Sequence, residues 1–130
     1  MMIFRDRRGE RGAAAVEFAL VLPVLLLLVL GMIEFSRVYN VQISLSNAAR
    51  EGARSMAIHN NPTQARAAAS LAAPSVTSPV LTTGNITVSP TDCTAGSTAT
   101  VTINYDVQLL TGYFGLTLPL TGKGVMLCGG

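Results

Sequence analysis

One apolar stretch of the sequence restricts the folds that this chain can adopt. Residues 18–33 are sixteen consecutive residues without a charge, and the stretch grows to twenty-one residues when it is extended back to Ala13 across Glu17. A helix of that length is about 31 Å long, which matches the hydrocarbon core of a bilayer. The rest of the chain is too short to bury a helix that is apolar on every side. We therefore expect a transmembrane helix over residues 13–33.

The charges beside this stretch predict its orientation. Only Arg37 follows in the first turn beyond the stretch, whereas four arginines precede it, at Arg5, Arg7, Arg8 and Arg11. Because positively charged flanks remain in the cytoplasm, residues 1–12 should form a cytoplasmic basic leader and the chain beyond residue 34 should lie outside the cytoplasm. Attraction to anionic lipid of the inner membrane is a further use for these arginines. The net charge of only +2 gives no reason to expect nucleic acid as a partner.

A cleaved secretory signal is not favoured. Its cleavage site would need small residues directly after the apolar core, but charged and bulky residues follow there instead, in the run Glu34-Phe35-Ser36-Arg37.

A carboxylate at the start of the apolar stretch is the most unusual feature within it. A charge costs about 2.5–3.5 kcal/mol at the centre of a bilayer, so Glu17 is either an interfacial glutamate that reaches the headgroups or a functional residue. Gly12 is a poor helix former, and we expect it to leave the junction of residues 11–13 extended and open to a membrane peptidase. A cut after Gly12 would create an ammonium on Ala13 and make Glu17 the fifth residue, followed by Phe18. That ammonium and the Glu17 of a neighbouring subunit would attract each other where water is scarce.

An amphipathic helix is predicted to continue the apolar one. Apolar and small residues recur at spacings of three and four over residues 35–56, and polar residues such as Ser55 are placed on the opposite side. The combined helix would cover residues 13–57. Its small residues permit close packing, either on the outer part of this chain or on a neighbouring subunit: Ala48, Ala49, Gly52 and Ala53. A second helix is expected to begin at Pro62, with Asn61 as its N-cap, and to end at residue 73.

The pattern of apolar and polar residues changes after Pro74. Apolar residues alternate with polar ones around residues 86–88 and 101–105, which predicts half-buried strands, and a third extended segment is expected at residues 116–120 and onward. The predicted fold class is α+β, with a long N-terminal helix and a small extracytoplasmic antiparallel sheet of three or four strands. The expected divisions are the leader at 1–12, the transmembrane helix at 13–33, an amphipathic helical region at 34–73 and a β-rich outer domain at 74–130.

The two cysteines, Cys93 and Cys128, both fall in this outer domain. Disulfides persist outside the cytoplasm, so we expect the two residues to form a bridge. Such a bridge would contribute about 3–4 kcal/mol in the chain-entropy treatment. The alternative is two unpaired thiols.

The sequence contains no catalytic constellation. Its single histidine, His59, stands in an expected turn between helices, and no spacing of histidine, cysteine and carboxylate residues is typical of a metal site. Neither a nucleophile elbow nor a phosphate-binding glycine loop is found. We therefore expect a protein that is not an enzyme and that uses no cofactor.

The segment from Arg11 to Ala57 resembles the TadE-like proteins of bacterial tight-adherence pilus systems. The resemblance rests on the order and spacing of short motifs: Arg11-Gly12, Ala15-Val16-Glu17-Phe18-Ala19-Leu20, Leu22-Pro23, Ile33-Glu34-Phe35 and Asn47-Ala48-Ala49-Arg50-Glu51-Gly52-Ala53-Arg54.

The resemblance implies a pilin-like fold and a minor pilin or pseudopilin of the bacterial inner membrane, with other pilin subunits as its partners. It also implies that a prepilin peptidase cuts after Gly12 and that Glu17 is recognised in processing and assembly. The alternative is an unprocessed single-pass envelope scaffold or adhesion protein.

Overall fold

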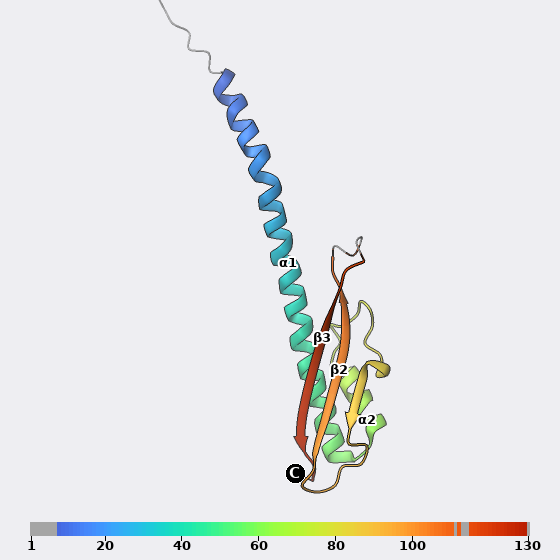
Figure 1. The fold of residues 1–130 in the computed structure, drawn as a ribbon. Coiled ribbons are helices and arrows are strands. Elements are labelled where there is room, and N and C mark those ends of the chain that lie inside the picture. The colour runs from blue at the N-terminus through green and yellow to red at the C-terminus, as the bar shows by residue number, and fades with distance from the viewer. Residues whose placement is uncertain (1–7, 111, 113–114, 130) are drawn as a thin grey trace, which may run out of the picture. The chain divides into compact units, whose positions relative to one another are not determined.

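The computed structural model describes residues 8–110, 112 and 115–129. Arg5 and Arg7 of the predicted leader lie outside the described residues. The chain divides into two compact units, Met1–Phe35 and Ser36–Gly130, and we call the second unit the head. Figure 1 shows the elements in chain order: α1 (Arg8–His59), α2 (Pro62–Leu71), the 3-10 helix η1 (Thr83–Asn85), β1 (Ile86–Ser89), β2 (Thr98–Gln108) and β3 (Thr117–Leu127).

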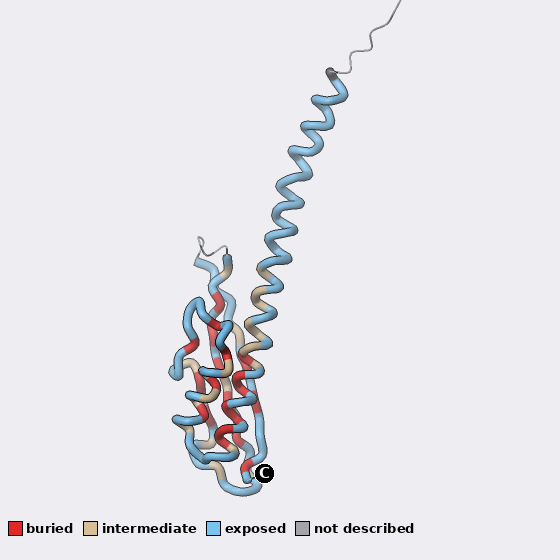
Figure 2. Tube along the Cα trace, turned by 180° about the vertical axis from the view of Figure 1, so that it is seen from behind, coloured by how far each residue is buried: buried red, intermediate tan, exposed pale blue. Residues whose placement is uncertain are grey.

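The described part of the first unit is the N-terminal portion of α1. Its side chains from residue 9 to 33 are all exposed, including the long run of leucine and valine residues (Figure 2). Pro23 lies inside the helix. The structure confirms the long apolar N-terminal helix, and among the described residues α1 is the one helix long and apolar enough to cross a membrane.

The head has an α+β fold, as predicted. Its three strands form an antiparallel sheet in the order β1-β2-β3. Along β2, every second residue is buried on the face that carries the helices, from Ala99 to Val107, and the intervening residues are polar. The third predicted segment and the residues after it form one strand of eleven residues, β3, which pairs with β2 along its whole length.

Within the head, the small residues of α1 pack against α2 and the sheet of the same chain. Ala48, Ala49 and Ala53 are fully buried. A Cβ added to Gly52 would lie 2.9 Å from the Cβ of Ala69 in α2, so α2 packs closely against α1 where Gly52 has no side chain. Of the two uses that the sequence left open for this face, the structure shows the intramolecular one.

Two glycines of β3 lie directly on the backbone of α1. A Cβ at Gly122 would lie 2.5 Å from the carbonyl oxygen of Leu45, and a Cβ at Gly124 would overlap the backbone of Ala49. Gly122 and Gly124 are two residues apart and therefore share one face of the strand, while Leu45 and Ala49 are one helical turn apart. With these two spacings, β3 packs on α1 with no side chain between the two backbones.

The predicted end of α2 and the predicted exposure of Ser55 are both wrong. Helix α2 ends at Leu71 rather than at residue 73, although Asn61 caps it as expected by accepting hydrogen bonds from the backbone N–H groups of Thr63 and Gln64. Ser55 was placed on the solvent side of α1 but is only 7% exposed. Its burial follows from the close approach of α2, which covers a wider arc of α1 than the apolar stripe alone indicates.

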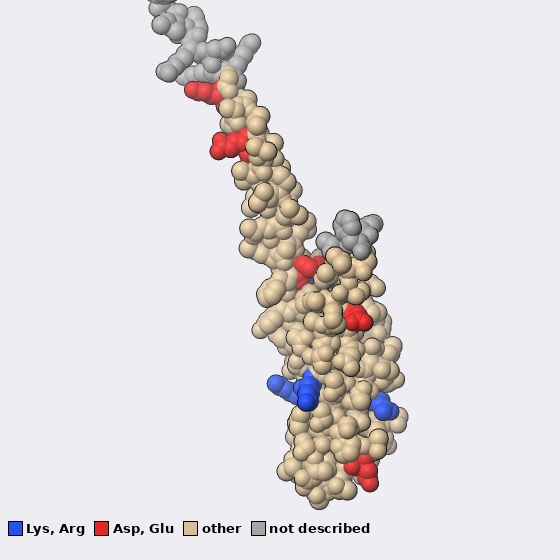
Figure 3. Space-filling view, viewed as in Figure 1, with Lys and Arg blue, Asp and Glu red and all other residues tan. Residues whose placement is uncertain are grey.

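The outer face of the sheet carries few charges. Its residues on β2 are threonine, asparagine, aspartate and glutamine, and Lys123 is the neighbour of Thr102 on β3. Figure 3 shows few acidic and basic side chains over β2 and β3. The threonine-rich composition of the outer domain is therefore explained by a polar, half-exposed sheet face.

Tyr105 links the sheet to the loop before η1. Its hydroxyl group donates a hydrogen bond to the carbonyl oxygen of Pro79 at 2.6 Å, and the residue is only 4% exposed. Arg37 donates a hydrogen bond to the carbonyl oxygen of Gln108 at 2.9 Å. Burial raises the pKa of Tyr105 above 10.0, and the charge of Arg37 offsets this shift only in part.

The raised pKa predicts that the head loses stability in alkali. Above pH 10.0 the tyrosine ionises in the unfolded chain while it is still protonated in the folded chain, so the free energy of unfolding falls as pH rises. Tyr105→Phe should remove this part of the pH dependence and should cost about 1 kcal/mol at neutral pH, because the hydrogen bond to Pro79 is lost. Urea unfolding of both proteins, at neutral pH and in alkali, measures the difference. Equal slopes against pH would contradict the prediction.

Candidate processing and assembly segment

The residues that the sequence singled out for processing lie in one exposed stretch of helix. Gly12, Ala13, Glu17 and Phe18 all belong to α1, and all four residues are exposed. Ala13 and Glu17 are four residues apart, so they lie on one face of the helix, one turn from each other. Phe18 is 64% exposed. A cut after Gly12 would therefore leave the new ammonium one turn from a carboxylate on the same face.

The expected extended junction around Gly12 is wrong, because α1 begins at Arg8 and continues through it. A glycine costs a helix about 1 kcal/mol relative to alanine, and the good helix formers that follow Gly12 outweigh this cost. Among the described residues, no heavy atom lies within 4 Å of the place where a Cβ of Gly12 would be, apart from the helix's own neighbouring backbone. Packing within the chain therefore does not require a glycine here.

Glu17 makes no ion pair with any residue that the structure describes. Its neighbours along the helix are apolar and exposed, with Val16 at 62%, Phe18 at 64% and Leu20 at 70%. In one isolated chain, water or lipid headgroups can solvate the carboxylate of Glu17. Once other apolar helices cover this surface, it requires a cationic or hydrogen-bonding partner.

The predicted disulfide between Cys93 and Cys128 is present, with the two Cα atoms 5.6 Å apart and a sequence separation of 35. Cys128 directly follows β3, and its N–H group donates a hydrogen bond to the carbonyl oxygen of Ser97 at 2.9 Å. The bridge therefore holds the end of β3 against the loop that precedes β2.

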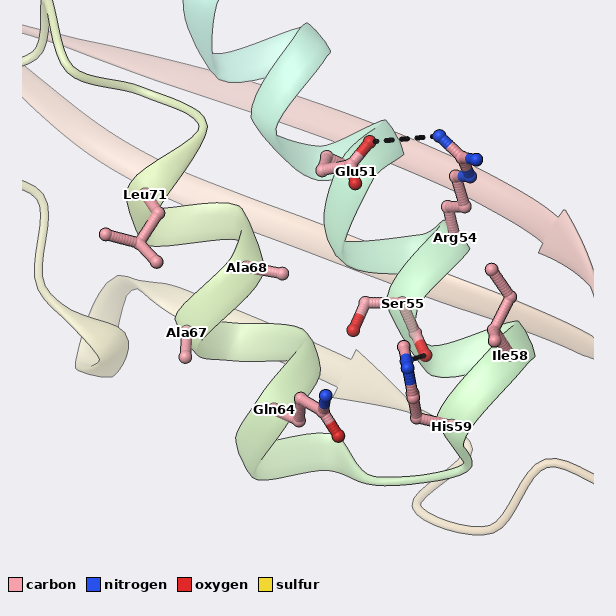
Figure 4. A pocket seen from close by; sticks show the side chains of 9 residues that line it. All are labelled: Glu51, Arg54, Ser55, Ile58, His59, Gln64, Ala67, Ala68 and Leu71. Carbon is pink, nitrogen blue, oxygen red and sulfur yellow. Dashed lines mark hydrogen bonds and ion pairs between the residues drawn. The ribbon is translucent and has the colours of Figure 1, made fainter.

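A hollow of about 480 Å³ lies between the end of α1 and α2. Figure 4 shows its lining, which includes the apolar side chains of Ile58 and Leu71, and Glu51 pairs with Arg54 at 3.9 Å. His59 is the last residue of α1 rather than a turn residue, and its Nδ1–H group donates to the carbonyl oxygen of Ser55. Across the described residues, no group of three or more histidine, cysteine or carboxylate side chains is placed to hold a metal ion.

Most of α1 matches a known protein family. The family described as TadE-like protein matches residues 12–54. These residues are a TadE-like domain. The domain starts at Gly12, contains Glu17 and Phe18, and extends over the buried small residues of α1. TadE-like proteins are structural rather than catalytic, and their family places this domain in the context of the tight-adherence pilus. No curated protein and no solved structure matches the chain significantly.

Proposed function

We propose that this chain is a TadE-like minor pilin or pseudopilin, a structural subunit that takes part in the assembly of a tight-adherence pilus. The observation that carries the proposal is the position of Gly12, Glu17 and Phe18 at the start of the TadE-like domain, on a helix whose apolar side chains are exposed. Exposed leucine and valine residues at this density need lipid or other apolar helices around them. A subunit that moves from membrane to filament has both.

In this proposal the chain enters the bacterial inner membrane as a single-pass protein. The leader at residues 1–12 stays in the cytoplasm, and the head is extracytoplasmic. A prepilin peptidase cuts after Gly12, and the partners of the processed chain are other pilin or pseudopilin subunits. Because the first turns of α1 are helical, the bond between Gly12 and Ala13 must become extended before it is cut. Gly9 and Gly12 lower the cost of that opening, since glycine weakens a helix.

The mature N-terminus tests this proposal. The protein is purified from membranes and from sheared filaments of cells that express it with its pilus system, and its N-terminal sequence is read. We expect Ala13 as the first residue, and the uncut chain in cells that lack the peptidase. Met1 at the N-terminus in peptidase-positive cells would contradict the proposal and support the alternative of an unprocessed envelope scaffold or adhesion protein.

A further inference from the structure

Asn60, directly after α1, connects the turn between the helices to the disulfide loop. Its side-chain oxygen Oδ1 accepts a hydrogen bond from the backbone N–H group of Cys93 at 2.6 Å. Its side-chain nitrogen Nδ2 donates a hydrogen bond to Oδ1 of Asp92 at 2.7 Å. Both halves of one amide group are therefore bonded to two consecutive residues that lie 32 and 33 positions further along the chain.

The backbone of Asn60 explains why an asparagine suits this position. Its φ of 48° lies in the left-handed region, which asparagine adopts more readily than other residues that have a side chain. Its N–H group still donates to the carbonyl oxygen of Met56, so the residue closes the last turn of α1. Asn61 then caps α2. The two asparagines therefore have different partners: Asn60 binds the disulfide loop, and Asn61 caps α2.

Each cysteine is held in place by a backbone hydrogen bond that does not involve sulfur. Cys93 donates to Asn60, and Cys128 donates to Ser97. The 5.6 Å between the two Cα atoms lies within the range that disulfides require. These hydrogen bonds can form before the bridge does, because none of them depends on oxidised sulfur. Folding of the reduced chain would then bring the two thiols together.

We propose that Asn60 is a positioning residue for the closure of the Cys93–Cys128 disulfide. In the folded, reduced protein its amide holds Cys93 within reach of Cys128. With glutathione disulfide as the oxidant, one thiol loses its proton and its thiolate attacks glutathione disulfide, which releases one glutathione and leaves a mixed disulfide. The second protein thiolate attacks the protein sulfur of that mixed disulfide and releases a second glutathione. The second step requires the two protein sulfurs to meet, and this is the step that Asn60 assists.

The thiol–disulfide equilibrium of the full-length protein in detergent tests this proposal. The protein is equilibrated with mixtures of reduced and oxidised glutathione, the reaction is quenched, and the oxidised fraction is read by mass spectrometry. Asn60→Ala should lower the equilibrium constant for bridge formation about tenfold relative to wild type, because the reduced loop loses the hydrogen bonds that place Cys93. Urea unfolding of the reduced proteins checks that each variant is folded before it is oxidised.

Asn61→Ala is the matched control. It makes the same change at the adjacent position and removes the two cap hydrogen bonds of α2, so it also destabilises the head, but it leaves the contacts of Cys93 in place. We expect its equilibrium constant to stay within about twofold of wild type. An equal loss in Asn60→Ala and Asn61→Ala would overturn the proposal, because general stability would then explain both results. An unchanged constant in Asn60→Ala would overturn it as well.

Asn60→Gly separates the side chain from the backbone. Glycine adopts the left-handed conformation without strain, so this variant keeps the turn and folds even where alanine does not. The proposal requires Asn60→Gly to show the same loss of about tenfold as the alanine variant. A wild-type equilibrium constant in Asn60→Gly would show that backbone conformation alone positions Cys93, and the proposal would then be wrong.

Discussion

Replacing Gly124 with alanine is expected to destabilise the head by about 3 kcal/mol, the upper end of the usual cost of overpacking. The added methyl group would occupy the place of the Ala49 backbone, and a backbone, unlike a side chain, cannot rotate away. Either β3 would have to separate from α1 or α1 would have to shift on the sheet. Both movements would open the buried contacts of Ala48, Ala49 and Ala53.

Urea unfolding of the full-length protein in detergent, followed by tyrosine fluorescence, measures this loss. Gly84→Ala serves as the control, because a Cβ at Gly84 would meet its nearest atom, Oγ1 of Thr82, at an ordinary distance of 3.6 Å. Its free energy of unfolding should stay within about 0.5 kcal/mol of wild type. If Gly124→Ala were equally mild, β3 would not be seated on the backbone of α1 as described.

Glu17→Gln is expected to reduce incorporation of the subunit into filaments by more than about tenfold, if the chain is the pilin-like subunit proposed above. Where apolar helices exclude water, an ammonium and a carboxylate about 4 Å apart attract by about 4 kcal/mol at an effective dielectric constant of 20. Glutamine keeps the size and polarity of the side chain but loses its charge. Even a third of that attraction corresponds to about tenfold in an equilibrium constant.

Assembly is measured as the fraction of the subunit in sheared filaments relative to the membrane. The N-terminus of the variant is sequenced at the same time, so that failed cleavage is not mistaken for failed assembly. Glu10→Gln is the matched control, because it makes the same chemical change on the same helix but in the part that the proposed cut removes. A cleaved Glu17→Gln protein with normal incorporation would exclude the charge-pairing role.

The helices and the sheet of this chain follow from local patterns that are visible in its sequence. Uninterrupted apolar residues predict the first part of α1, and periodic small residues predict the second. Alternation of apolar and polar residues predicts β1 and β2, because each strand has one buried face. The bridge between Cys93 and Cys128 follows from an even number of cysteines in a segment expected outside the cytoplasm.

Close backbone contacts could not be predicted in the same way. The run Gly122-Lys123-Gly124 lacks the apolar residues that mark a buried strand face, so nothing in its pattern indicates a contact with α1. Ser55 gives a similar error, because its burial depends on how closely α2 approaches. Asn60 was missed because its partners, Asp92 and Cys93, lie more than thirty residues away. A pair of asparagines after a helix was the one available signal, since asparagine tolerates positive φ.

The sequence by itself determined the long apolar helix, the α+β character of the chain, the spacing of Gly12, Glu17 and Phe18, and the pairing of the cysteines. These properties depend on residue type and on short-range periodicity, which act before any tertiary contact forms. Only the tertiary structure decided that α2 and the sheet of the same chain cover the small residues of α1. It also decided that β3 contacts α1 through two glycines and that Asn60 forms hydrogen bonds with the disulfide loop. These contacts join segments distant in the chain, and their geometry depends on the shapes of both surfaces together.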